Sequence, residues 1–184
     1  MHKKSTITVL LVTVGLSALS VHAALPKLDA QSLGESQLKK RIHKELVTLP
    51  YYGVYDNLAF DVNDGTVVLS GQVVRPITRS DAVRRVKNTQ GVANVINNIQ
   101  VLPLSRFDDS IRVRTYRAVF QTDGLYRYAM GANPSIHIVV NHGHVTLEGV
   151  VSTATDSQMA YLAANGVSGV FSVTNNLRVE RART

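Results

Sequence analysis

The feature that most constrains the fold is an internal repeat. When the sequence is shifted by 78 positions, residues 62–101 align with residues 140–179 without a gap, and 14 of the 40 pairs are identical. Duplication of one unit is the simplest explanation of such a repeat. In a chain of 184 residues we therefore expect two copies of one small fold.

The identical residues predict a β-hairpin in each copy. Four identities fall on every second residue, the spacing of side chains along one face of a strand. They are the pairs Val67/Val145, Leu69/Leu147, Gly71/Gly149 and Val73/Val151. An apolar strand precedes each, at 58–62 and 136–140, and is joined to it by Asn63-Asp64-Gly65 or Asn141-His142-Gly143. Asn and Gly tolerate the positive φ of a tight hairpin turn.

Helical spacing surrounds each hairpin. After the hairpin, apolar residues recur at helical intervals in 80–89 and in the second copy, and each helix is expected to end near Gly91 or Gly169. A last strand follows at 94–101 and 172–179. Before the first hairpin an apolar stripe predicts another helix, ended by Pro50. Its residues are Leu38, Ile42, Leu46 and Leu49.

The predicted fold class is therefore α+β, with two tandem units of order αββαβ. Because a strand–helix–strand connection crosses over right-handed, each unit should form a three-stranded mixed sheet with two helices on one face. We expect a signal peptide at 1–23, a linker at 24–34, a first domain at 35–102, a linker at 103–107, a second domain at 108–180 and a tail at 181–184.

The first residues have the form of a secretory signal peptide. Lys3 and Lys4 precede an apolar run over 7–19, and Val21-His22-Ala23 resembles a cleavage site. The run is shorter than the roughly 20 apolar residues of a spanning helix. We expect cleavage after Ala23 and a periplasmic or secreted protein; an uncleaved anchor is the alternative. The sequence has no Cys, which excludes disulfides and a lipoprotein anchor.

Both copies resemble the BON domain, the module named for bacterial osmotic-stress and nodulation proteins. The first copy has the pattern Gly65-Thr66-Val67-Val68-Leu69-Ser70-Gly71-Gln72-Val73, and the second has Gly143-His144-Val145-Thr146-Leu147-Glu148-Gly149-Val150-Val151. The closing strands share Val-x-Asn-Asn-x-x-Val. The resemblance implies two tandem BON domains that bind anionic phospholipid or other envelope components, take part in osmotic-stress protection and carry out no catalysis.

No motif for catalysis or for a cofactor is present. The chain has no nucleophile elbow, phosphate-binding loop, dinucleotide fingerprint or zinc-protease motif. The residues that the copies share are of the types that fill a core or form turns, whereas ionisable residues do not recur. His137, His142 and His144 lie near one turn, but a zinc site normally needs three or four convergent ligands. We expect no enzyme activity, cofactor or metal.

The segment 106–128 is the candidate binding site. Wound as a helix from Asp109, it places Ile111 and Thr115 on one side and Val113, Tyr116 and Phe120 nearly opposite, with arginines between. One sheet cannot bury both faces, so the second face should meet either the first domain or a bilayer interface. The candidate residues are Arg112, Val113, Arg114, Tyr116, Arg117, Phe120, Tyr126, Arg127 and Tyr128.

Two functions from different classes fit these observations. The formal net charge of +7 favours an anionic partner, and export makes nucleic acid an improbable one. The first hypothesis is salt-sensitive binding to anionic phospholipid. The second is docking of an envelope protein on the open face or an edge of a sheet. The oligomeric state is left open by the sequence.

Overall fold

The computed structural model describes residues 27–131 and 133–180. The predicted signal peptide at 1–23 and the tail at 181–184 lie outside the described residues.

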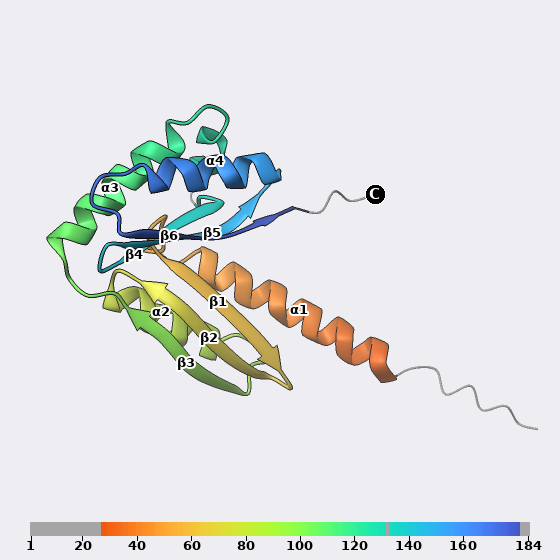
Figure 1. The fold of residues 1–184 in the computed structure, drawn as a ribbon. Coiled ribbons are helices and arrows are strands. Elements are labelled where there is room, and N and C mark those ends of the chain that lie inside the picture. The colour runs from red at the N-terminus through yellow and green to blue at the C-terminus, as the bar shows by residue number, and fades with distance from the viewer. Residues whose placement is uncertain (1–26, 132, 181–184) are drawn as a thin grey trace, which may run out of the picture.

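Two units follow one another along the chain (Figure 1). Domain 1 consists of α1 (Lys27–Val47), β1 (Asn57–Asn63), β2 (Thr66–Val73), α2 (Pro76–Lys87) and β3 (Asn94–Val101). Domain 2 consists of α3 (Arg106–Phe120), a short 3-10 helix η1 (Tyr126–Ala129), β4 (Ile136–Asn141), β5 (His144–Val151), α4 (Ala154–Asn165) and β6 (Ser172–Val179). The predicted α+β class and the order αββαβ are confirmed.

The helix α3 begins earlier than the sequence analysis expected. It begins at Arg106 and not at Asp109, because the Ser105 side chain caps it by accepting a hydrogen bond from the Asp108 N–H at 3.1 Å. The additional turn places Phe107 on the helix.

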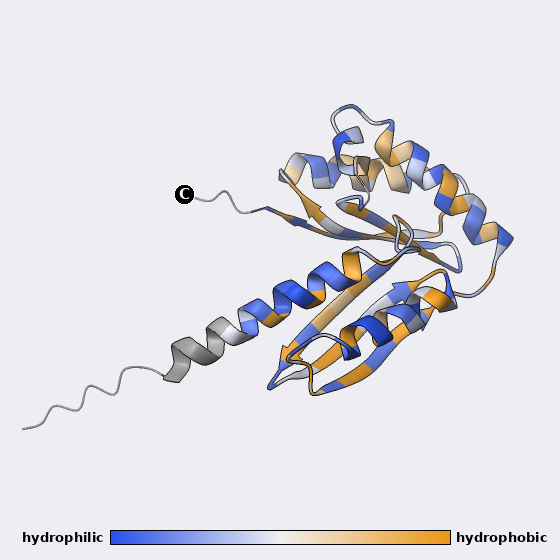
Figure 2. Cartoon of the chain, turned by 180° about the vertical axis from the view of Figure 1, so that it is seen from behind, coloured by the Kyte–Doolittle hydropathy of each residue, from blue (hydrophilic) through white to orange (hydrophobic). Residues whose placement is uncertain are grey.

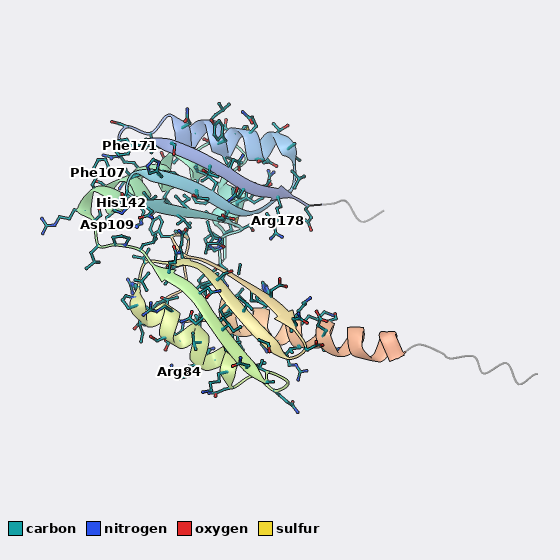
Figure 3. The ribbon with its side chains drawn as sticks, turned by 60° about the horizontal axis from the view of Figure 1, so that its bottom comes forward. Arg84, Phe107, Asp109, His142, Phe171 and Arg178 are labelled. Carbon is teal, nitrogen blue, oxygen red and sulfur yellow. The ribbon has the colours of Figure 1, made fainter. Side chains whose placement is uncertain are left out.

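Each domain has a three-stranded mixed sheet with the hairpin strand β2 or β5 in the centre. The strand β2 is antiparallel to β1 and parallel to β3, and β5 has the same relation to β4 and β6. In each domain both helices cover one face of the sheet (Figures 1 and 3). Figure 2 shows that the exposed sides of α1 and α2 are mostly hydrophilic.

The alternating residues of the repeat form the cores, as predicted. Val67, Leu69 and Val73 are fully buried beneath the helices of domain 1, and their counterparts in β5 are buried in domain 2. In the closing strands, one shared Asn of each copy accepts a hydrogen bond from the backbone two residues further on. Asn97 accepts a hydrogen bond from the Ile99 N–H at 3.0 Å, and Asn175 accepts one from the Leu177 N–H at 3.2 Å.

The two copies differ in the connection before the hairpin. The strands repeat after 78 residues, but the buried helix positions repeat after 73. The corresponding buried pairs are Leu38/Ile111, Ile42/Thr115 and Leu46/Val119. Between equivalent helix and strand positions, domain 2 therefore has five more residues than domain 1, and its connection contains η1.

The shared glycines Gly71 and Gly149 allow the hairpin strands to approach each other closely. Their φ values are +110° and +121°, and a Cβ atom would lie only 2.1 Å from the Asn57 carbonyl oxygen or 2.0 Å from the Ser135 carbonyl oxygen. Any side chain would therefore collide with backbone that cannot move without breaking the sheet.

We predict that Gly71→Ala and Gly149→Ala each lower the free energy of unfolding by at least about 2 kcal/mol, because each combines a steric collision with a positive φ. Chemical denaturation measures the effect. Gly34→Ala in α1 is the matched control, since beyond its chain neighbours and the backbone of its own helix no atom lies within 4 Å of its added Cβ. A small effect at both sheet positions would contradict this view of the hairpin.

The domains are joined by a segment of domain 1 that lies along the edge of β4. The Ile138 N–H donates a 2.7 Å hydrogen bond to the Val54 carbonyl, and Val54 and Tyr55 pack against the core of domain 2. Asp56 fixes the segment to domain 1, because its carboxylate accepts hydrogen bonds from the Gly53 and Val74 N–H groups. We call residues 53–55 the docked segment.

Docking buries a histidine between the domains. His137, on the open face of β4, contacts the Gly53 carbonyl through Nδ1 at 3.2 Å, and its ring lies 5.3 Å from that of Tyr52. Burial is the largest influence and lowers the pKa of His137, although the Gly53 and Asp56 backbone and the Asp56 and Glu148 carboxylates act in the opposite direction. The junction therefore favours neutral His137.

We predict that acidification destabilises the wild-type protein more than the His137→Asn variant. A lowered folded-state pKa gives stability that is present above the ordinary value of 6.5 and is lost as the pH falls below it. The test is the urea midpoint of both proteins between pH 7.5 and pH 5.5, a range chosen to span that value. Equal acid sensitivity of the two proteins would contradict the prediction.

Candidate functional site

Two exposed aromatic side chains meet at one end of domain 2. Phe107 lies in the first turn of α3, and Phe171 directly precedes β6. Their ring centroids are 6.0 Å apart, and their exposed fractions are 46% and 69%. Figure 3 shows them near His142 of the β4–β5 turn. We call Phe107, Phe171, His144 and Arg114 the aromatic end.

A buried carboxylate holds α3 against this turn. Asp108 accepts hydrogen bonds from the His142 N–H at 3.0 Å and the Gly143 N–H at 2.8 Å. His142 has a φ of +52°, which the fixed turn maintains. Phe107, next to Asp108 in the sequence, is thereby held at the end of the sheet.

The rings pack over backbone that has no side chain. A Cβ atom at Gly143 would lie 2.7 Å from the Phe171 ring and 3.3 Å from the Phe107 ring. The Phe171 N–H donates to the Gly143 carbonyl at 2.9 Å, and the His144 ring meets the Phe171 ring edge-on at 5.9 Å. The aromatic end is therefore positioned by the backbone although it is exposed to solvent.

Positive charge lies beside the rings. The Arg114 Nη2 atom is 3.2 Å from the position of an added Cβ on Gly169, and Phe107 lies against the same glycine. Arg106 and Arg114 are exposed, and neither forms an ion pair with any residue that the structure describes. An exposed aromatic pair beside free guanidinium groups can contact both apolar and anionic groups.

The nine predicted site residues do not form one surface. Three of them are buried and have structural contacts. Arg112 donates to the Val140 carbonyl at 2.8 Å and pairs with Asp109, Phe120 lies in the core, and Tyr128 donates to Asp156 at 2.9 Å. These contacts leave the three side chains little surface for a ligand.

Two further predicted residues make contacts within the protein. Tyr116 packs edge-on against Tyr55 of domain 1 at 6.4 Å, so at this position the second face of α3 meets the first domain. Arg127 pairs with Asp156 at 2.8 Å and stacks over the Tyr128 ring at 4.7 Å. The remaining four, Val113, Arg114, Arg117 and Tyr126, are exposed.

Phe107 and Phe171 were missed because the sequence analysis followed the identities between the copies. Phe171 aligns with Ala93, and the hydrogen bond of Phe171 to Gly143 has its counterpart from Ala93 to Gly65 at 2.8 Å. The replacement of a small residue by an exposed aromatic one was the available signal. It distinguishes domain 2 from domain 1.

The described residues offer neither a metal site nor a membrane span. No group of three or more His, Asp and Glu side chains there could hold a metal ion. No helix in that part of the chain is both long and apolar enough to cross a membrane.

A family model for the BON domain matches the chain at residues 34–103 and 127–181. The chain belongs to the BON domain family. The tandem architecture inferred from the repeat is thereby confirmed, and BON domains are non-enzymatic, envelope-associated domains. No curated protein matches the chain.

Solved structures show a distant likeness. One is from structural studies of CdsD, a structural protein of the Type III secretion system of Chlamydia trachomatis, with 12% identity, a TM-score of 0.33, and coverage of 79% of this chain and 93% of that chain. Another is the C-terminal domain of CdsD, with 12% identity, a TM-score of 0.28, and coverage of 78% and 98%. A likeness this weak carries no argument about function.

We predict that Asp108→Ala destabilises this BON protein by about 2–4 kcal/mol, because it leaves two backbone N–H groups without their acceptor. Denaturant unfolding measures the loss, and Asp123→Ala, which removes an exposed carboxylate, is the control. Equal effects of the two variants would show that Asp108 does not hold α3 to the turn.

Proposed function

We propose that this BON protein binds anionic phospholipid surfaces in the cell envelope, and that the aromatic end of domain 2 makes the contact. The observation that carries the proposal is the exposed pair Phe107 and Phe171, fixed over glycine backbone with Arg114 beside it. Aromatic side chains are favoured at the depth of lipid headgroups, and arginine reaches phosphate from the same depth.

One feature close in the sequence supports contact with a membrane surface. Leu104, in the connection before α3, is 96% exposed. Residues 24–184, which follow the expected cleavage site, carry a formal net charge of +5, and this charge attracts an anionic surface before any residue inserts. Tyr116 and Phe120 contribute little to this surface because they pack inside the protein.

The test is sedimentation with vesicles of phosphatidylcholine alone or of equal parts phosphatidylcholine and phosphatidylglycerol, at low and high salt. We expect binding to the anionic vesicles that weakens with salt. The Phe107→Ser/Phe171→Ser variant should bind at least about tenfold more weakly, since each Phe that leaves water contributes about 1.5–3 kcal/mol.

The control for this variant is Ile77→Ser/Leu162→Ser, which removes two exposed apolar side chains from α2 and α4. It should bind like the wild type. No binding to anionic vesicles, or equal losses in the two double variants, would refute the proposal.

A second comparison tests the charge. Arg114→Gln should weaken vesicle binding about fivefold, because a basic residue near an anionic surface contributes about 1 kcal/mol. Arg79→Gln removes the same charge from α2 and should have a smaller effect. If the two substitutions weaken binding equally, the attraction is general and is not centred on the aromatic end.

A further inference from the structure

Domain 1 has an open groove at the position where domain 2 holds the docked segment. In domain 2 the docked segment lies between α3 and the edge of β4, with the Ile138 N–H on the Val54 carbonyl and Tyr116 against Tyr55. In domain 1 the corresponding space between α1 and the edge of β1 is a cavity of about 500 Å³. It is lined by Glu35, Ser36, Lys39, Lys40, His43 and Phe60.

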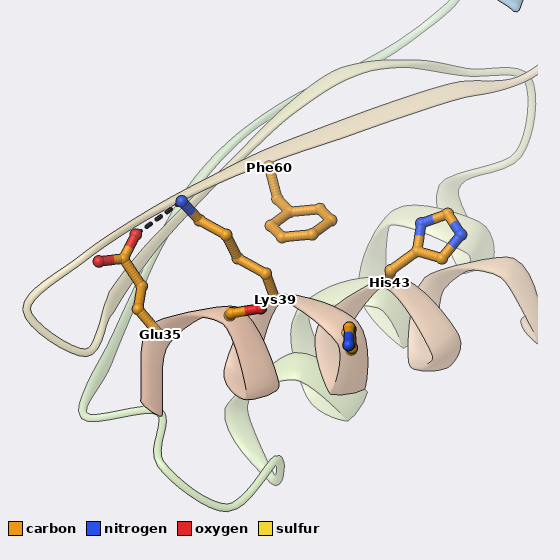
Figure 4. Close-up of a pocket in the computed structure, with 6 residues that line it drawn as sticks. Glu35, Lys39, His43 and Phe60 are labelled. Atoms are coloured by element: carbon orange, nitrogen blue, oxygen red, sulfur yellow. Dashed lines mark ion pairs between the residues drawn. The ribbon is translucent and has the colours of Figure 1, made fainter. Parts of the chain in front are cut away.

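The two offsets of the repeat show that these spaces are equivalent. The helix offset of 73 relates His43 to Tyr116 and Lys40 to Val113, and the strand offset of 78 relates Phe60 to Ile138. Figure 4 shows the Phe60 side chain opposite Lys39 and His43 across the groove. The groove of domain 1 is thus the unfilled counterpart of an occupied site.

The edge of β1 has the same hydrogen-bonding register as the edge of β4. Phe60 pairs with Leu69 as Ile138 pairs with Leu147, so the Phe60 N–H points away from β2 as the Ile138 N–H points away from β5. Among the described residues, no carbonyl from another segment accepts from Phe60. An unpaired edge N–H beside an open groove, as at Phe60, is the geometry that extended peptides use when they add to a sheet.

Charge distinguishes the open groove from the filled one. Where domain 2 has Val113 and Tyr116, domain 1 has Lys40 and His43. Lys39 is paired with Glu35 at 2.6 Å, whereas Lys40 has no ion-pair partner among the described residues. At its far end the groove continues, past His43 and Phe60, into a cleft of about 770 Å³ between the domains, where Arg178 is exposed.

We propose that the α1–β1 groove of domain 1 binds an extended segment of a partner protein in which an acidic residue accompanies an aromatic one. The partner's backbone would pair with the Phe60 N–H, its ring would lie on His43, and its carboxylate would meet Lys40. The docked segment followed by Asp56 has this composition, Gly-Val-Tyr-Asp. This interaction uses a different domain and a different surface from the proposed lipid contact.

The probe for this site is a fluorescein-labelled peptide with the chain's own residues 51–58, Tyr-Tyr-Gly-Val-Tyr-Asp-Asn-Leu. The protein already holds its own copy on domain 2, so the added peptide should bind domain 1. Fluorescence anisotropy should show saturable binding. Lys40→Glu should weaken it at least about tenfold, because a facing charge is reversed. Lys87→Glu, the same reversal on α2, should leave the affinity within about twofold.

Amide shifts in a ¹⁵N-labelled sample locate the peptide. Shifts at Phe60 and along α1 are expected. No saturable binding up to about 1 mM, which corresponds to about −4 kcal/mol, would overturn the proposal. Shifts confined to β4 and α3 would also overturn it, because the peptide would only be replacing the docked segment. Equal losses of peptide affinity in the two lysine variants would reveal unspecific electrostatic attraction and would contradict the proposed site.

Self-association of the chain must also be distinguished from binding of a separate partner. If the chain without peptide forms a dimer that Lys40→Glu abolishes in sedimentation equilibrium, the groove is filled by a second copy, and the proposal of a separate partner fails. A monomer in both proteins supports it.

Discussion

The hydrogen bond between the Ile138 N–H and the Val54 carbonyl closes one sheet edge and orders the junction around it. Around it, Tyr55 lies against Tyr116, and His137 is buried beside Gly53 and Tyr52. The edge of β4, which could otherwise pair with another chain, is thereby paired within the molecule. The two surfaces proposed for binding are left uncovered by this docking: the aromatic end of domain 2 and the α1–β1 groove of domain 1.

The two BON domains share their cores and differ at their surfaces. Positions that are identical in the copies, such as Val67/Val145 and Gly71/Gly149, serve packing or close backbone approach. Positions that differ create the candidate sites. Phe171 replaces Ala93 at the end of the sheet, and Tyr116 replaces His43 in the helix that borders the edge strand.

The fold was largely predictable from the sequence, because alternation and turn residues report local geometry directly. The αββαβ order, the hairpins and the buried strand face all follow from such patterns. The candidate site was less predictable, because a helical projection does not show which backbone groups of the neighbouring strand a side chain can reach. Arg112 looked like an exposed charge, yet it donates to the Val140 carbonyl from a buried position. Phe107 required the earlier helix start that Ser105 provides.

Amide hydrogen exchange at two equivalent positions tests most directly whether one sheet edge is filled and the other is open. The Ile138 amide should exchange at least about tenfold more slowly than the Phe60 amide, because only the former donates to a docked carbonyl. Similar, rapid exchange at both positions would show that the docked segment does not hold the domains together. Similar, strong protection at both would show that the edge of β1 is not free, and would contradict the division between a filled and an open site.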